Sequence, residues 1–234
     1  MEQFVIQGGI PLSGTVVPSG NKNAALPILA ATLLTDKPVT LHNLPNIGDV
    51  RTMMPLLEYL GATIERHGNH SATICAEEIR STRPDPALFS QIRGSLTLLG
   101  PMLARAGEIE LSLPGGDRIG TRRVDTHLLA LEALGASVEY NDRFKMHTRG
   151  LSGAGIWLDE ASVTGTENAI MAACLARGET IIRHAASEPH VQELSNLLNC
   201  MGAHIEGIGS NVLRIQGQTK LDGGEWTIGP DFME

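Results

Sequence analysis

A stretch in the middle of the chain, LPGGDRIGTRRVDTH, gathers side chains that could bind anions and move protons. Asp117 could act as a general acid if burial beside a bound anion raised its pKa, or it could simply form an exposed ion pair with Arg118. Arg122 offers a planar fork of donors for a phosphate or carboxylate, and Arg123 could stack on a flat ring. Asp125 could contribute to the same site or serve only as a helix N-cap. The Pro-Gly-Gly that opens the stretch provides a hinge by which the loop could close over a ligand.

Two more cations precede strongly apolar segments that read as helices. Lys22 and Asn23 follow Gly20, and free N–H groups at a helix start together with an ammonium group suit a phosphate. Arg93 has the same position ahead of a second apolar segment, and Thr164 lies in SVTGT ahead of a third. Taken singly, Lys22 could be a solvated turn residue and Arg93 a surface ion-pair partner. If the three loops are equivalent, they converge on one cleft.

The elements that must position these residues repeat three times. LLEYLGATIERHG, LLALEALGASVEYND and LSNLLNCMGAHIEGIG each predict an amphipathic helix closed by glycine (Gly61, Gly135 and Gly202) and followed by a strand. Each is preceded by an apolar helix and a strand, so the unit is helix, strand, helix, strand, strand, at a spacing of roughly 70 residues. In the first unit Asp49 could cap the helix that begins at Val50, or it could have a functional role.

The pattern predicts an α/β fold with a pseudo-threefold axis. ALPILAATLL and AIMAACLA are apolar nearly all round, so these helices should lie at the centre with the sheets outside. A single continuous sheet of parallel strands would contradict this arrangement.

Composition limits the class of protein. The net charge of −8 disfavours nucleic acid and anionic membranes as partners, so an anionic ligand must be attracted by local cations. Cys75, Cys174 and Cys200 lack ligand or redox spacing and are expected to be inert core thiols in a reducing compartment. With neither a signal sequence nor a long apolar run, we expect a cytoplasmic protein.

The two ends do not fit the repeat. The strand-like FVIQGGIPLSGTVVPSG precedes the first unit, and GPDFME follows the third after a Gly-Pro turn. We therefore expect this chain to be part of a longer protein.

The motifs GNKNAALPILAATLL, NLPNIGDV, LPGGDRIGTRRVDTH, ALGA and AASEP resemble those of the enolpyruvyl transferases, in particular the enzymes that act on UDP-N-acetylglucosamine. The resemblance runs through the whole chain. It implies an inside-out α/β barrel, the enolpyruvyl transferase fold. It also implies transfer of the enolpyruvyl group of phosphoenolpyruvate to the sugar 3-hydroxyl, the first committed step of peptidoglycan synthesis, without a metal or other cofactor.

The same resemblance implies roles for individual residues. Lys22 and Arg122 would hold the phosphoenolpyruvate anion, and Asp117 would be the proton donor at a position where most members carry Cys. Glu160 stands where some members use Lys near the diphosphate. The residues expected to bind substrate are Lys22, Asn23, Arg93, Arg122, Arg123, Val124, Asp125, Thr126, Ser162 and Val163.

Family members have two domains, which implies boundaries here. Residues 1–21 would supply the first strand or strands of a second, mostly missing domain. Residues 22–229 would form a complete threefold domain, and residues 230–234 would begin the crossing back. The missing domain of the same chain would be a partner and would carry the catalytic base.

Two other interpretations stay open. One is an enolpyruvyl transferase that acts on shikimate 3-phosphate, against which stand the RRVDTH loop and the absence of paired serines. The other is a non-enzymatic threefold binding domain, disfavoured because Lys22, Arg93, Asp117 and Arg122 all lie in loops that can converge.

Overall fold

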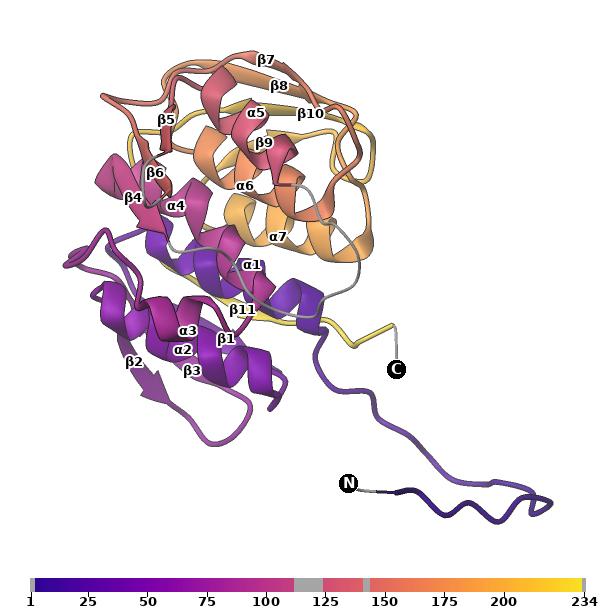
Figure 1. Cartoon of the computed structure of the whole chain (residues 1–234). Coiled ribbons are helices and arrows are strands. Elements are labelled where there is room, and N and C mark those ends of the chain that lie inside the picture. The colour runs from indigo at the N-terminus through magenta and orange to yellow at the C-terminus, as the bar shows by residue number, and fades with distance from the viewer. Residues whose placement is uncertain (1–2, 112–123, 141–143, 233–234) are drawn as a thin grey trace.

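Three small sheets surround a group of central helices in the computed structural model of the chain (Figure 1). The structure describes residues 3–111, 124–140 and 144–232. None of the helices in this part of the chain combines the length and apolar character that crossing a membrane requires.

Each of three units runs helix, strand, helix, strand, strand, as the sequence predicts. The first unit contains α1 (Lys22–Ala31), β1 (Val39–His42), α2 (Gly48–Leu60), β2 (Thr63–Arg66) and β3 (Ala72–Cys75). The second contains η2 (Arg93–Leu98) continued by α4 (Leu99–Ala106), then β4 (Glu108–Leu111), α5 (Asp125–Ala133), β5 (Ser137–Tyr140) and β6 (Phe144–His147). The third contains α6 (Val163–Ala173), β8 (Glu179–Arg183), α7 (Pro189–Cys200), β9 (His204–Glu206) and β10 (Val212–Gln216). The remaining described elements are η1 (Thr32–Leu34), α3 (Pro86–Phe89), β7 (Gly155–Trp157) and β11 (Gly224–Thr227).

The three units share one strand order. The third strand of each unit lies between the first and the second and is antiparallel to both, which gives β1-β3-β2, β4-β6-β5 and β8-β10-β9. The second helix of each unit is followed by a glycine with positive φ, 120° at Gly61, 97° at Gly135 and 93° at Gly202. A side chain is disfavoured in this conformation, so the predicted closing glycines are required by the turn.

The segments that join the units close the threefold arrangement. β7, which follows the second unit, pairs in parallel with β8 of the third. β11, which follows the third unit, pairs in parallel with β1 of the first. Beside β4, at the edge where the other two sheets have a joining strand, the backbone at Thr82 lies instead. The carbonyl of Thr82 accepts a hydrogen bond of 2.9 Å from the N–H of Glu110 in β4. Three separate sheets are present rather than one continuous parallel sheet, which confirms the predicted architecture.

The core lies between the central helices and the inner faces of the sheets. Residues 24–31 of α1 and residues 165–173 of α6 are all buried, so these two helices are covered on every side. The strands alternate, as in β8, where Thr180 and Ile182 are buried and their neighbours are more exposed. Apolar helices thus occupy the centre because no face of them tolerates water, while strands with one polar face cover them.

Two equivalent residues hold the joining strands in place from a left-handed backbone conformation. Asn43 (φ 54°) follows β1, and its side-chain amide donates a 2.9 Å hydrogen bond to the carbonyl of Ile228, the residue after β11. His184 (φ 60°) follows β8, and its Nδ1 donates a 2.9 Å hydrogen bond to the carbonyl of Leu158, the residue after β7. The first and third units therefore share both the left-handed residue after their first strand and its side-chain hydrogen bond to the joining strand's end.

Residues 3–19 form no strand within this chain, and their large apolar side chains are exposed. That residues 1–21 supply the first strand or strands of a second domain stays a prediction. The prediction that all three cysteines lie in the core is wrong. Of the three cysteines, only Cys174 is buried, while Cys75 is partly exposed and Cys200 is exposed. Burial raises the pKa of the Cys174 thiol to about 12, so this cysteine alone matches the expected inert core thiol.

Candidate functional site

The three central helical segments begin with three of the predicted site residues. Lys22 is the first residue of α1, Arg93 is the first of η2, and Val163 is the first of α6. These three elements contact one another, and because they are equivalent in the threefold arrangement, they begin at the same end of the domain. The three helical segments thus start at one end of the domain, and that their first residues share one ligand-binding cleft stays a prediction.

Lys22 lies exposed at the start of α1, next to Asn23. The side chain of the buried Asn21 caps this helix by accepting a 3.0 Å hydrogen bond from the N–H of Ala24. Nζ of Lys22 lies 2.8 Å from Oδ2 of Asp49. The prediction that Asp49 caps the second helix is wrong: α2 begins at Gly48 after Ile47, so Asp49 lies in its first turn and pairs with Lys22 instead.

The start of α5 packs against the start of α6. Thr126 is buried, and its hydroxyl donates a 2.7 Å hydrogen bond to Oδ1 of Asp159 and lies 3.4 Å from Oε1 of Glu160. A Cβ placed on Gly165 would lie 3.0 Å from the Thr126 methyl group, so glycine permits this close approach. Ser162 caps α6 by accepting a hydrogen bond from the N–H of Gly165.

The structure therefore brings the predicted segments 124–126 and 162–163 together. Val124 is partly buried ahead of α5, and Asp125 is the first residue of that helix rather than its N-cap. Asp117, Arg122 and Arg123 lie outside the described residues.

His127 is buried between these helix starts. Burial and, second, the positive charge of Arg93 lower the pKa of His127 to about 4, so the ring is neutral at pH 7. The cation of Arg93 thus lies close enough to α5 to act on His127. A neutral histidine here avoids burying a positive charge close to the cation of Arg93.

The arrangement suits an anionic ligand. Lys22 and Arg93 supply cations, and the starts of α1 and α6 place the positive ends of two helix dipoles at this end of the domain. Among the residues that the structure describes, no group of three His, Cys, Asp or Glu side chains is placed to hold a metal ion.

Sequence reasoning missed three polar residues near this end of the domain. Asn168 is fully buried within α6 and bonds to two other helical segments. Asp159 accepts the hydrogen bond from Thr126, and Asp231 accepts one of 3.3 Å from the side chain of Asn21. An asparagine next to the apolar run AIMAACLA is a signal that could have pointed to Asn168.

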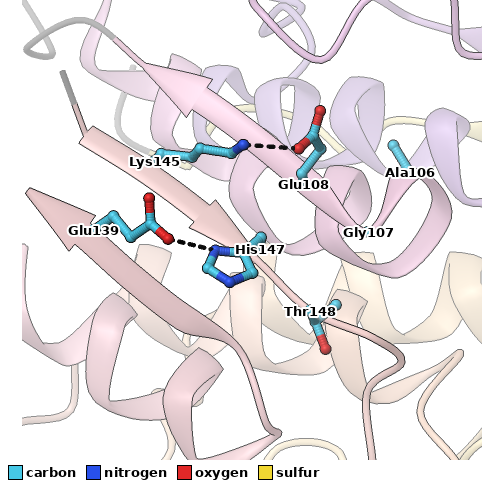
Figure 2. Close-up of a pocket in the computed structure, with 7 residues that line it drawn as sticks. All are labelled: Ala106, Gly107, Glu108, Glu139, Lys145, His147 and Thr148. Carbon is cyan, nitrogen blue, oxygen red and sulfur yellow. Dashed lines mark ion pairs between the residues drawn. The ribbon is translucent and has the colours of Figure 1, made fainter.

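A pocket at the opposite end of the second unit does not belong to this site. It lies on the sheet formed by β4, β6 and β5, where α4 ends, whereas Arg93 lies where the same helical segment starts (Figure 2). Its charged residues pair with each other: Glu108 lies 3.1 Å from Lys145, and Glu139 lies 3.7 Å from His147. The ammonium group of Lys145 is therefore already paired with the carboxylate of Glu108.

Comparison with known proteins assigns the chain to a family. The family model described as EPSP synthase (3-phosphoshikimate 1-carboxyvinyltransferase) matches residues 6–234. The chain belongs to the EPSP synthase family. It is therefore a member of a family of enolpyruvyl transferases, which is the class of protein that its motifs resemble.

Relatives within the EPSP synthase family include proteins that share half of the residues of this chain. The UDP-N-acetylglucosamine 1-carboxyvinyltransferase of Treponema denticola is 52% identical over 234 residues, which are 100% of this chain and 55% of the relative. The protein of the same name from Bradyrhizobium diazoefficiens is 51% identical over 232 residues, 99% of this chain and 54% of the relative. The chain thus spans about half the length of these curated relatives.

Solved structures of family members share the fold. The enolpyruvyl transferase NikO from Streptomyces tendae superposes with a TM-score of 0.83 at 23% identity, covering 97% of this chain and 54% of NikO. An EPSP synthase from Acinetobacter baumannii gives 0.74 at 18% identity, covering 93% of this chain and 50% of that enzyme. At these identities the likeness concerns the fold, and it confirms the enolpyruvyl transferase fold predicted from the sequence.

Proposed function

We propose that this chain forms the nucleotide-sugar-binding part of an enzyme that transfers the enolpyruvyl group of phosphoenolpyruvate to the 3-hydroxyl of UDP-N-acetylglucosamine. This reaction is the first committed step of peptidoglycan synthesis. The observation that carries the proposal is the identity of about half of all residues, along the whole chain, to relatives named for this activity. The cations and helix starts that converge at one end of the domain support it.

The reaction sets chemical requirements that the candidate residues meet. The sugar oxygen bonds to C2 of phosphoenolpyruvate, the methylene carbon takes up a proton and later returns it, and inorganic phosphate leaves. Lys22 and Arg122 would bind the anionic groups of phosphoenolpyruvate, while Asn23 and Arg93 contact the ligands in the cleft. Asp117 would supply the proton, for which it must be protonated near neutral pH.

The nucleotide sugar would lie along the starts of α5 and α6. Residues 122–126, with Ser162 and Val163, would line its site, and the contact of Thr126 with Gly165 supports one continuous surface for it. Arg123 would stack its guanidinium group on the uracil ring. At the position of Glu160 some relatives have a lysine near the diphosphate. A glutamate there would weaken that contact.

The two ends of the chain would connect this domain to a second one. Residues 1–21 would contribute the first strand or strands of that domain, and residues 230–234 would begin the return to it. Two observations support this: the apolar side chains of residues 4–17 are exposed, and Gly20 pairs antiparallel with Pro230 as the two segments leave together. The catalytic base would come from the second domain.

A shikimate 3-phosphate transferase is the second candidate, because the matching family model carries the name of that enzyme. The identity of about half of the residues to UDP-N-acetylglucosamine enzymes favours the first candidate. Both substrates are therefore compared in one experiment.

The test is calorimetric titration of this chain with UDP-N-acetylglucosamine and, in parallel, with shikimate 3-phosphate at low and moderate salt. Arg122→Ala removes a proposed ligand contact, and Arg149→Ala removes the same charge from an exposed position at the far end of the domain. We expect saturable binding of the nucleotide sugar only, lost in the first variant and kept in the second. Binding of shikimate 3-phosphate alone, or of neither ligand, would contradict the proposal for this chain.

Activity can be tested by joining residue 234 to the part of the Treponema denticola relative that this chain does not match. We expect the joined protein to release phosphate from phosphoenolpyruvate only when UDP-N-acetylglucosamine is present. Phosphate release driven by shikimate 3-phosphate instead would contradict the assigned acceptor.

A further inference from the structure

Asn168 is a fully buried polar residue whose amide is saturated with contacts. Its Oδ1 accepts a hydrogen bond of 2.7 Å from the N–H of Gly100. Its Nδ2 lies 3.0 Å from the carbonyl oxygen of Leu96, 2.9 Å from Nδ1 of His127 and 3.1 Å from the carbonyl oxygen of Thr164. A backbone N–H can only donate, so the contact with Gly100 determines which atom of the amide is the oxygen.

These contacts join three segments that carry proposed ligand-binding residues. Leu96 belongs to η2, which Arg93 begins, and His127 is two residues into α5, next to Thr126. Asn168 itself lies in α6, which Val163 begins. A Cβ on Gly100 would lie 2.5 Å from the carbonyl oxygen of Asn168, so the backbones of α4 and α6 approach closely only because this residue is glycine.

The orientation of the amide also determines the state of the histidine. An amide nitrogen does not accept hydrogen bonds, so in the 2.9 Å contact with Nδ2 the Nδ1 atom of His127 accepts and carries no proton. The two amide hydrogens are then shared among Nδ1 and the carbonyl oxygens of Leu96 and Thr164. The hydrogen of the neutral ring is then on Nε2, which lies 3.1 Å from the hydroxyl oxygen of Thr164 and donates to it. One chain of hydrogen bonds thus runs from Gly100 through Asn168 and His127 to Thr164.

We propose that Asn168 is a positioning residue for the nucleotide-sugar site, because its side-chain amide holds the starts of η2, α5 and α6 in one fixed arrangement. This inference rests on the proposed function and names a residue on which the geometry of that site depends. Asn168 is buried beneath the helix starts, so it acts through Arg93, Thr126 and Val163 rather than by touching the ligand. Buried networks of this kind hold one arrangement because any displaced member leaves a polar group without a partner.

Asn168→Asp is the sharpest variant, because it keeps the shape of the side chain and the acceptor for Gly100 but removes both amide hydrogens. A carboxylate cannot donate to Nδ1 of His127, so the ring should take up a proton there and pair with the new charge. Asn199→Asp is the matched control. The Asn199 amide also bonds one backbone N–H and one carbonyl, both of Ile205, but it lies in α7 away from the three helix starts.

Two measurements are made on the unsubstituted chain and on both variants: calorimetric titration with UDP-N-acetylglucosamine, and ¹⁵N NMR of the histidine rings at pH 7. The unsubstituted chain should show His127 protonated on Nε2 only. Asn168→Asp should add a proton at Nδ1 and weaken binding about tenfold or more, whereas Asn199→Asp should change neither result.

Each other outcome contradicts a specific statement. Binding by Asn168→Asp as tight as that of the unsubstituted chain would overturn the positioning role and leave the proposed function intact. A proton on Nδ1 of His127 in the unsubstituted chain would overturn the hydrogen-bond assignment on which the role depends. Failure of the unsubstituted chain to bind would overturn the proposed function and the positioning role with it.

Discussion

Lys22 and Asp49 form an ion pair between the first turns of α1 and α2, with Nζ of Lys22 2.8 Å from Oδ2 of Asp49. Asp49 is near enough to the start of α2 to benefit from the helix dipole as well. The lysine that is proposed to bind a substrate anion therefore already has a carboxylate partner. An incoming anion must compete with this carboxylate for the same ammonium group.

Asp49→Asn should strengthen the binding of phosphoenolpyruvate to this chain a few-fold, because removal of a competing charge is worth about 1 kcal/mol near the surface. Both side chains are partly exposed, 46% for Lys22 and 34% for Asp49, so the stability of the fold should change by less than about 1 kcal/mol. The measurement is titration with phosphoenolpyruvate at low salt, with Asp36→Asn, which breaks the remote pair with Lys37, as control. Weaker binding by Asp49→Asn would mean that Asp49 orients Lys22 rather than competing for it.

His127 should make the fold less stable as the pH falls from about 6.5 to about 4. Its pKa is about 4 in the folded chain and ordinary when unfolded, so the unfolded chain binds more protons in this range. The free energy of unfolding lost over the window is about 3 kcal/mol. Urea unfolding at several pH values should show a shallower pH dependence for His127→Gln than for the natural chain. His204→Gln, at an exposed position on β9, is the control, and equal slopes in all three proteins would contradict the prediction.

Glu167 should have the opposite pH dependence. Burial and, second, the charge of Glu188 raise the pKa of Glu167 well above its ordinary value, and its Oε1 has no hydrogen-bond partner among the described residues. The stability that the protonated carboxyl group contributes below pH ~4.5 is therefore lost as the pH rises toward the folded pKa, at about 1.4 kcal/mol for each pH unit. Glu167→Gln should unfold at higher urea concentration than the natural chain at pH 7, and the difference should shrink toward pH 4.5.

The matched control for Glu167 is Glu206→Gln, which neutralises an exposed carboxylate on β9. A gain in stability from Glu167→Gln that persists unchanged at pH 4.5 would show that the gain comes from packing rather than from protonation.

Asn43 should tolerate glycine better than alanine. Asn43→Gly keeps the left-handed backbone available and loses mainly the hydrogen bond to Ile228, worth about 1 kcal/mol. Asn43→Ala loses the same hydrogen bond and adds backbone strain, so it should cost about 2 kcal/mol in total. Thermal unfolding should rank the natural chain above the glycine variant and the glycine variant above the alanine variant. An alanine variant at least as stable as the glycine variant would exclude strain at this turn.

The pattern of apolar residues is sufficient to predict the three units and their place in the fold. The central position of α1 and α6 follows from their long apolar runs, ALPILAATLL and AIMAACLA, and the glycine after each second helix follows from the turn that it must make. Both are local consequences of residue type. They can be inferred without knowing which segments meet.

Features that depend on a distant partner cannot be predicted in this way. The sequence suggests a helix cap at Asp49 because capping is the usual role of an aspartate before a helix, yet Lys22 lies next to it only once α1 and α2 have packed. The apolar segment around Cys200 suggests a core position, but this cysteine lies at the end of α7, where the helix surface faces solvent.

The sequence by itself determined the repeat, the family and the cations that precede the central helices, because each depends on residue type and spacing along the chain. Only the tertiary structure decided that Asn168 would meet His127 and Gly100, residues 41 and 68 positions away. The physical reason is that a buried amide bonds to whichever groups the packing of the helices brings within reach. That packing is a property of the whole core and not of any one segment.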